Sequence, residues 1–78
     1  MAPQKLEKSA SQFATCAIKY DSQGARGMAI THYQKASESL LKLMRLYPDS
    51  KLNKIYAVRM KSYQDRICLL YTSDAADE

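Results

Sequence analysis

The 78-residue sequence has only two glycines, two prolines, one histidine and no tryptophan. Glycine and proline interrupt helices most strongly, so their scarcity, beside many Ala, Leu, Lys, Ser and Gln residues, favours helical segments. The sequence also lacks an apolar run of about 18 residues, the length that a membrane-spanning helix needs. The amino-terminal stretch MAPQKLEKSASQ is too polar for a secretory signal. We therefore expect a helical protein of the cytoplasm.

The residues that build catalytic and metal sites are equally scarce. Cys16 and Cys68 match no metal-binding spacing, and we interpret them as incidental thiols of a reducing cytoplasm. His32 has no second histidine and no group of carboxylates beside it, and no phosphate-binding glycine loop occurs. A chain of this length forms at most one domain with a thin core. The sequence predicts a binding module rather than an enzyme, without catalytic residues, metal or cofactor.

The positive charge is unevenly distributed. All 12 lysines and arginines lie at or before Arg66, whereas residues 68–78 carry Asp74, Asp77 and Glu78 and no base. The formal net charge is +4 for the whole chain and +7 for residues 1–67. The positive charge of residues 1–67 favours binding to an acidic peptide, an anionic membrane surface or nucleic acid. It is also compatible with helix surfaces that only face solvent.

Apolar residues recur at steps of three and four in three segments, which is the spacing of an amphipathic helix. The segments are 4–21, 25–47 and 51 to at least 67. Gly24 can end the first helix in the left-handed conformation, and Pro48 stops the second. Asp49 or Ser50 can cap the third. Short connections between three such helices predict an all-α, antiparallel, up-down-up three-helix bundle.

One protein family shares much of this sequence pattern. The pattern comprises Ala10, Phe13, Ala14, Ala17, Asp21 and Gly24, then Ala29, Ile30, Tyr33, Lys35, Ala36 and Leu40, then Tyr47-Pro48-Asp49-Ser50, and last Tyr63, Asp65, Arg66 and Ile67. Over residues 5–67 it resembles the MIT (microtubule-interacting and transport) domain, in particular the amino-terminal domain of archaeal Cdv-type AAA ATPases that act on ESCRT-III. The resemblance implies a three-helix bundle that binds the carboxy-terminal tails of ESCRT-III-like filament proteins.

The implied function is that of an adaptor. The domain would recruit an AAA ATPase to such filaments in archaeal cell division or membrane scission. The parent ATPase would form a homo-oligomeric ring, membranes would be contacted only indirectly, and no nucleic acid would bind. Two alternatives stay open. The first is a single tetratricopeptide-like helical adaptor, which has a similar sequence pattern around its second helix. The second is a basic helical nucleic-acid binder, which would use the positive charge.

The resemblance also suggests where a peptide would bind. The family uses a groove between helices one and three for extended, proline-containing tails, and a second groove between helices two and three. In the second groove an apolar residue stands where this sequence has Gln64, which makes the first groove the preferred hypothesis. The predicted groove residues are Ala14, Ile18, Arg59, Tyr63 and Arg66.

The carboxy-terminal string CLLYTSDAADE does not follow the family. With the last codon completed as Glu, its 11 residues agree with the in-frame translation of a transposase adapter used to prepare sequencing libraries. We therefore expect residues 1–67 to be the MIT-like domain and residues 68–78 to be a non-native tail on a fragment of a longer protein. Cys68, Leu69, Leu70 and Tyr71 carry apolar groups at spacings that could still prolong the third helix.

Overall fold

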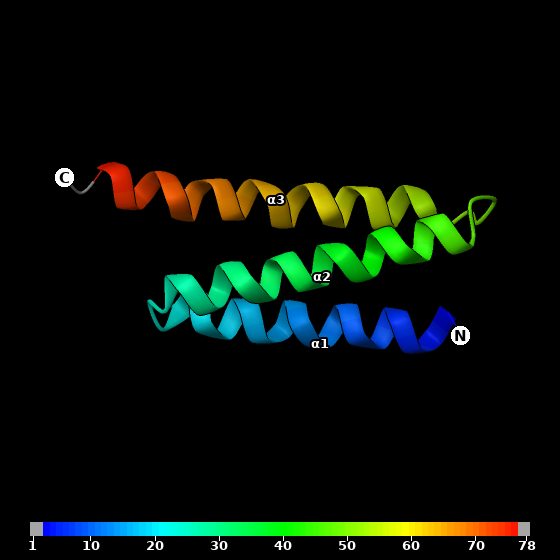
Figure 1. The fold of residues 1–78 in the computed structure, drawn as a ribbon, viewed down its shortest axis with the longest axis horizontal. Helices are drawn as coiled ribbons and strands as arrows, with labels where there is room; N and C mark the ends of the chain where they lie inside the picture. Colours follow the sequence, from blue (N-terminus) through cyan, green and yellow to red (C-terminus); the bar gives the residue numbers. More distant parts are fainter. Residues whose placement is uncertain (1–2, 77–78) are drawn as a thin grey trace.

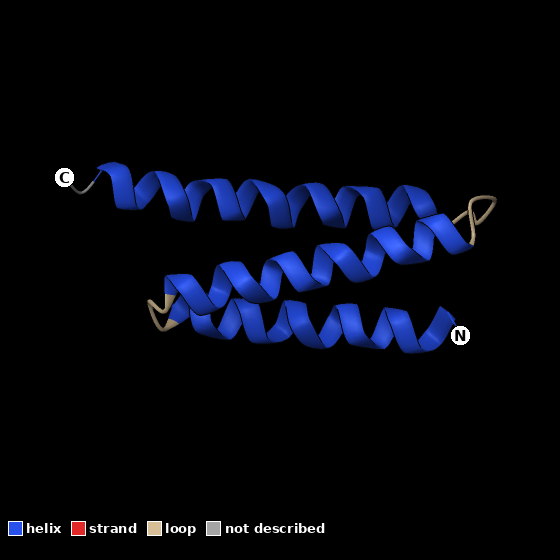
Figure 2. Cartoon of the chain, in the orientation of Figure 1, coloured by secondary structure: helices blue, strands red, loops and turns tan. Residues whose placement is uncertain are grey.

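The structure is a computed structural model that describes residues 3–76. Three α-helices make up the described chain: α1 (Pro3–Ser22), α2 (Arg26–Leu46) and α3 (Asn53–Ala76). Figure 2 shows helices joined by two short connections, with no strand in residues 3–76. The chain runs up, down and up, so that α2 is antiparallel to both neighbours (Figure 1). The predicted all-α, antiparallel three-helix bundle is confirmed.

Gly24 shapes the connection between α1 and α2. Its φ of +81° lies in the left-handed region that residues with a side chain rarely adopt. The Ala25 amide donates to the Tyr20 carbonyl at 2.9 Å, and the Gly24 amide donates to the Asp21 carbonyl at 3.1 Å. This pair of hydrogen bonds is the Schellman motif, which satisfies the last carbonyls of a helix. The predicted role of Gly24 is confirmed.

The connection between α2 and α3 depends on a residue that the sequence pattern did not single out. The Asn53 side-chain amide donates to the carbonyls of Tyr47 and Pro48, at 2.9 and 3.1 Å. Ser50 Oγ accepts the Leu52 amide at 3.2 Å, just before the helix begins. Because residues 50–52 are held in this turn, α3 starts at Asn53 rather than near residue 51.

The α2 helix is the centre of the bundle. It packs against both α1 and α3, whereas within the described chain no Cα atom of α1 lies within 8 Å of one in α3. Fully buried alanines, among them Ala17, Ala29 and Ala36, allow close helix packing. The first core cluster consists of Leu6, Ala10, Leu40, Leu43 and Tyr56. The second consists of Ala17, Ala29, Ile30, Tyr33 and Leu70.

Burial departs from the sequence pattern in two places. Tyr47 and Leu52 are apolar residues of the segments predicted to be helical, but 37% and 45% of their surfaces are exposed because both lie in the turn rather than against a neighbouring helix. Leu70, in contrast, is buried in the second cluster. Helix α3 thus continues across the predicted junction between residues 67 and 68. The non-native origin of residues 68–78 stays a prediction, and residues 1–2 and 77–78 lie outside the described chain.

No helix of the described chain offers an apolar stretch long enough to span a bilayer.

Candidate functional site

Two polar links join α1 to α3, one toward each end of the bundle. Near the start of both helices, the Tyr56 hydroxyl donates to Glu7 Oε1 at 2.7 Å. Near the end of α1, the Arg66 guanidinium donates through Nη2 to Asp21 Oδ1 at 2.8 Å and through Nε to Oδ2. Because the two backbones stay apart, these side chains define the surface between α1 and α3.

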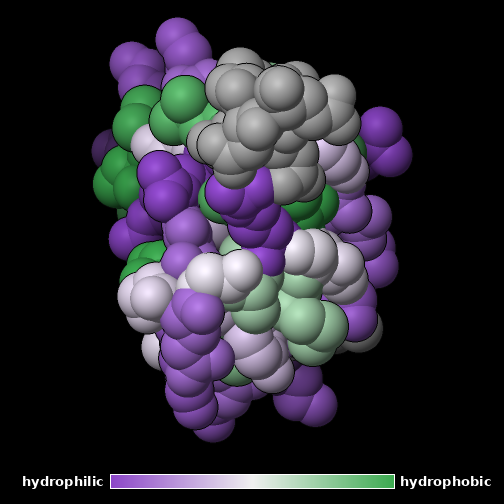
Figure 3. All heavy atoms as spheres, turned by 90° about the vertical axis from the view of Figure 1, so that its left-hand side faces the viewer, coloured by the Kyte–Doolittle hydropathy of each residue, from purple (hydrophilic) through white to green (hydrophobic). Residues whose placement is uncertain are grey.

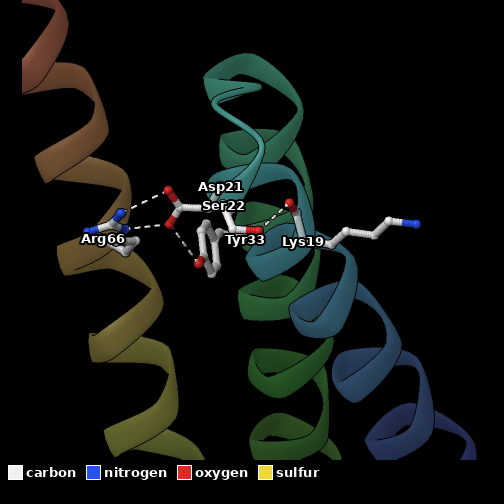
Figure 4. Close-up of polar contacts among 5 residues, drawn as sticks. All are labelled: Lys19, Asp21, Ser22, Tyr33 and Arg66. Atoms are coloured by element: carbon white, nitrogen blue, oxygen red, sulfur yellow. Dashed lines mark hydrogen bonds and ion pairs between the residues drawn. The ribbon is translucent and has the colours of Figure 1, made fainter.

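The Asp21 carboxylate gathers side chains from all three helices (Figure 4). Its Oδ2 also accepts the Tyr33 hydroxyl at 3.2 Å. The hydrogen bond from Arg66 lowers the pKa of Asp21, against the opposing effect of burial. Burial, reinforced by the nearby carboxylate, raises the pKa of Tyr33. At neutral pH the group therefore holds an ionised carboxylate, a guanidinium and a protonated phenol, which we call the Asp21 cluster.

Tyr56 links α3 to α1 at the other end of the bundle, through its hydrogen bond to Glu7. Burial, followed by the hydrogen bond to Glu7, raises its pKa to about 12. The positive charge of Arg59, three residues further along α3, opposes this rise. Tyr56 is thus a protonated donor at neutral pH.

The five predicted groove residues lie on facing sides of α1 and α3. On α1, Glu7, Ala14, Ile18 and Asp21 are spaced by seven, four and three residues, which places them on one helix face. The two outer members of this series bind α3, so the face between them points toward α3. On α3, Tyr56, Arg59, Tyr63 and Arg66 follow the same kind of spacing.

Their environments differ. Ala14 is buried, whereas Ile18 is 58% exposed, which is unusual for an isoleucine. Arg59 is exposed, and Tyr63 is half-buried with its ring centre 5.8 Å from that of Tyr33. Arg66 is exposed as well, but its guanidinium is held by Asp21. The surface combines apolar groups with two cations, and its use as a binding groove stays a prediction.

Comparison with known proteins identifies the family. The family model described as MIT (microtubule interacting and transport) domain matches residues 7–72. The chain belongs to the MIT domain family. It is also similar to Cell division protein C of Sulfolobus acidocaldarius, with 43% identity over 51 residues. That match covers 65% of this chain and 14% of the Sulfolobus protein, so the chain corresponds to a small part of that relative.

MIT domains are non-catalytic modules that bind partner proteins, which confirms the predicted binding module at this level. The family match also removes the single tetratricopeptide-like adaptor from consideration. It extends to residue 72, beyond the predicted domain end at residue 67.

A hollow of this MIT domain lies between α2 and α3. It measures about 660 Å³ and is lined by Gln34, Ser37, Glu38, Leu41, Met60, Gln64, Ile67 and Cys68. Gln64 borders the hollow, at the position where the family resemblance implies an apolar side chain. The buried Ser37 hydroxyl has no hydrogen-bond partner within the described residues. This groove is open but mixed in polarity, and the preference for the surface between α1 and α3 stays a prediction.

His32 of the MIT domain contributes to packing. Its ring lies 5.0 Å from Tyr20 and 6.3 Å from Phe13, measured between centres. Its Nδ1 lies 2.8 Å from the Met28 carbonyl oxygen and donates to it when it carries the hydrogen. Within the described chain no three metal-ligating side chains come together.

Sequence reasoning missed the residues that link the helices. The sequence marked Asp21 as part of the family pattern but not as the partner of a residue 45 positions away. One signal could have marked it: Asp21 continues the small-residue series of Ala10, Ala14 and Ala17 at the same steps of four and three. A carboxylate on the buried face of a helix needs a partner from another helix.

Proposed function

We propose that this MIT domain is a peptide-binding adaptor that recruits an AAA ATPase to the carboxy-terminal tails of ESCRT-III-like filament proteins. The process served would be archaeal cell division or membrane scission, in the cytoplasm. Family membership supports a protein-binding role, and the likeness to a protein named Cell division protein C supports division. The structural observation that carries the proposal is the apolar and cationic surface between α1 and α3.

That surface suits an extended, acidic tail. Ala14 is buried below this surface, and the exposed Ile18 offers the peptide an apolar contact. The half-buried Tyr63 ring can pack against a proline of the tail. Arg59 provides a guanidinium for a peptide carboxylate. Together these groups suit a tail peptide in which acidic and apolar residues alternate.

Arg66 takes part differently, because Asp21 already binds its guanidinium. A peptide carboxylate can reach Arg66 only by sharing or replacing Asp21. Arg59 is therefore the main electrostatic anchor in this proposal, and Arg66 mainly shapes the wall of the groove.

A single tail should bind modestly, with a Kd on the order of micromolar, because the surface is small and open. A homo-oligomeric ring of ATPases would present several copies of the domain. Filaments present several tails, so that avidity raises the overall affinity.

The proposal is tested by titrating the ¹⁵N-labelled chain with acidic, proline-containing tail peptides and following amide shifts by NMR. Shifts are expected at Ala14, Ile18, Arg59 and Tyr63. Arg59→Glu should weaken binding about tenfold, because an ion pair becomes a repulsion.

Lys61→Glu provides the matched control. Lys61 lies two residues further along α3, about 200° around the helix, and is exposed like Arg59. The control changes the net charge equally and should bind as the unchanged chain does. Equal losses in both variants, or shifts confined to Gln34, Leu41 and Gln64, would refute the assignment to the α1–α3 surface.

A further inference from the structure

The connection between α2 and α3 exposes apolar side chains that the proposed peptide groove does not use. Leu46 is 56% exposed, Tyr47 37% and Leu52 45%. All three line one hollow of about 440 Å³, together with Pro48 and the buried Leu43 and Tyr56; Glu7, Asp49 and Ser50 complete its lining. The three exposed apolar side chains therefore border one hollow rather than standing isolated, and exposed apolar groups gathered in this way mark interaction sites.

Cations neighbour these apolar residues in space or in the sequence. Lys42 and Arg45 line an adjoining hollow that also includes Leu46. Lys51 precedes Leu52 in the turn, and Lys54 lies in the first turn of α3. From residue 42 to residue 54 the chain carries four cations and one carboxylate, a net charge of +3. We call Lys42, Arg45, Leu46, Tyr47, Lys51 and Leu52 the basic tip.

We propose that the basic tip binds the surface of an anionic lipid bilayer. Aliphatic side chains such as Leu46 and Leu52 enter the boundary between headgroups and acyl chains, and a tyrosine ring suits the headgroup level. Lysines and arginines beside them neutralise lipid phosphates and carboxylates. This direct contact goes beyond the indirect membrane association implied by the family resemblance, and it does not depend on the peptide groove.

A bilayer fits these residues better than a nucleic acid does. RNA and DNA offer phosphates to the cations and flat bases for stacking, but branched aliphatic side chains such as Leu46 and Leu52 do not stack. A partner with an apolar layer below its charged surface satisfies both the apolar and the cationic residues of the basic tip.

The shape of the bundle supports end-on binding. The molecule extends about 45 × 18 × 13 Å, and the α2–α3 connection lies at one end of the long axis, beside the start of α1 (Figure 1). Lys5, at that start, is exposed and adds a further cation. Binding through this end leaves the surface between α1 and α3 open along most of its length, so lipid and peptide can be held at once.

The test is co-sedimentation of the 78-residue chain with vesicles of phosphatidylcholine alone, or of equal parts phosphatidylcholine and phosphatidylserine. Binding is expected only to the mixed vesicles and should weaken as salt is added. Lys51→Glu with Lys54→Glu should lower the partition coefficient by at least about 25-fold, since each cation near the surface contributes about fivefold. Leu46→Ser should lower it by several-fold, because an exposed apolar group no longer enters the bilayer.

The matched control is Lys19→Glu with Lys61→Glu, which alters the net charge equally at exposed positions away from the tip. It should retain most of the binding. Circular dichroism checks that every variant is folded. The proposal is overturned if the chain does not bind mixed vesicles, if the two double variants lose binding equally, or if Leu46→Ser has no effect. Tighter binding to an RNA duplex than to vesicles at the same salt would overturn it in favour of nucleic acid.

Discussion

At the α1–α2 end of the bundle, one carboxylate gathers side chains from all three helices, whereas the α2–α3 end leaves apolar and cationic side chains in solvent. The first end satisfies its polar groups internally through Asp21, Tyr33 and Arg66. Figure 3 looks onto it and shows hydrophilic side chains, a pale centre and several hydrophobic groups between them. The second end exposes Leu46 and Leu52. The polar side chains at the first end are used by the fold itself, whereas the second end carries the basic tip that we propose to bind a bilayer.

We call the α2–α3 end of the bundle the open end. The largest expected effect on stability tests whether a well-packed core lies below it. Leu40, with 1% of its surface exposed, belongs to the cluster below that end. Leu40→Ala should cost roughly 2–5 kcal/mol of unfolding free energy, because it removes buried methyl groups and leaves a cavity. Urea denaturation followed by circular dichroism measures the loss.

Leu41→Ala is the control, since Leu41 is the same residue type one position later and is 37% exposed. It should cost clearly less. Equal losses in the two variants would mean that the core below the open end is not packed as described.

The next largest effect on stability concerns the α1–α2 end of the bundle, which we call the closed end. Asp21→Ala removes the acceptor of the buried Tyr33 hydroxyl and the partner of Arg66. It should cost roughly 1–3 kcal/mol, mainly from the unsatisfied hydroxyl, because the half-exposed Arg66 regains water. The same denaturation experiment measures it. An unchanged stability would show that the Asp21 cluster does not hold the helices together.

The Asp21 cluster also predicts a pH dependence. Arg66 lowers the pKa of Asp21 from its ordinary value of 3.8, so the folded chain binds this proton less readily than the unfolded chain. The contribution to stability is complete above that ordinary pKa and is lost as the pH falls through the lowered one. Stability measured from neutral to strongly acidic pH should therefore fall more steeply for the unchanged chain than for Asp21→Asn, which cannot titrate there.

The two glycines give a smaller pair of opposite effects at the closed end. Gly24→Ala should cost about 1–2 kcal/mol, because the left-handed conformation disfavours a side chain. Gly27→Ala should instead stabilise by about 0.5–1 kcal/mol, because Gly27 is helical and an added methyl group meets nothing within 4 Å. Thermal denaturation distinguishes the signs. Destabilisation by both substitutions would contradict the turn geometry.

The smallest effect is expected at the open end. Tyr56→Phe removes the hydrogen bond to Glu7 but keeps the buried ring. The loss should be about 0.5–1 kcal/mol, since the partly exposed Glu7 carboxylate can bind water instead. Chemical denaturation measures it. A loss larger than that of Asp21→Ala would reverse the proposed difference between the two ends.

Much of the fold follows from local sequence patterns. The apolar steps of three and four predicted all three helices, and Gly24 and Pro48 marked the two turns. These features depend on residues close together in the chain. The start of α3 was placed too early because the turn depends on the Asn53 side chain reaching back to Tyr47. A general preference for Asp or Ser as a cap does not reveal that contact.

The candidate site was less accessible to sequence reasoning. Spacing placed Ala14 and Ile18 on one face of α1, and Tyr63 and Arg66 on one face of α3, but how far each helix is rotated toward the other is set by tertiary packing. The pairing of Arg66 with Asp21 depends on that rotation. The sequence therefore predicted Arg66 as a groove cation without identifying Asp21 as its partner.

The central place of α2 also has a consequence for amide hydrogen exchange. This helix is covered on two sides, whereas α1 and α3 each pack their backbones against α2 alone. Because protection from exchange follows local packing, the slowest amides should lie in α2, and the outer helices should open more often. A peptide that bridges α1 and α3 would slow exchange mostly in those two helices, so bound tails would be visible as increased protection at the edges of the bundle.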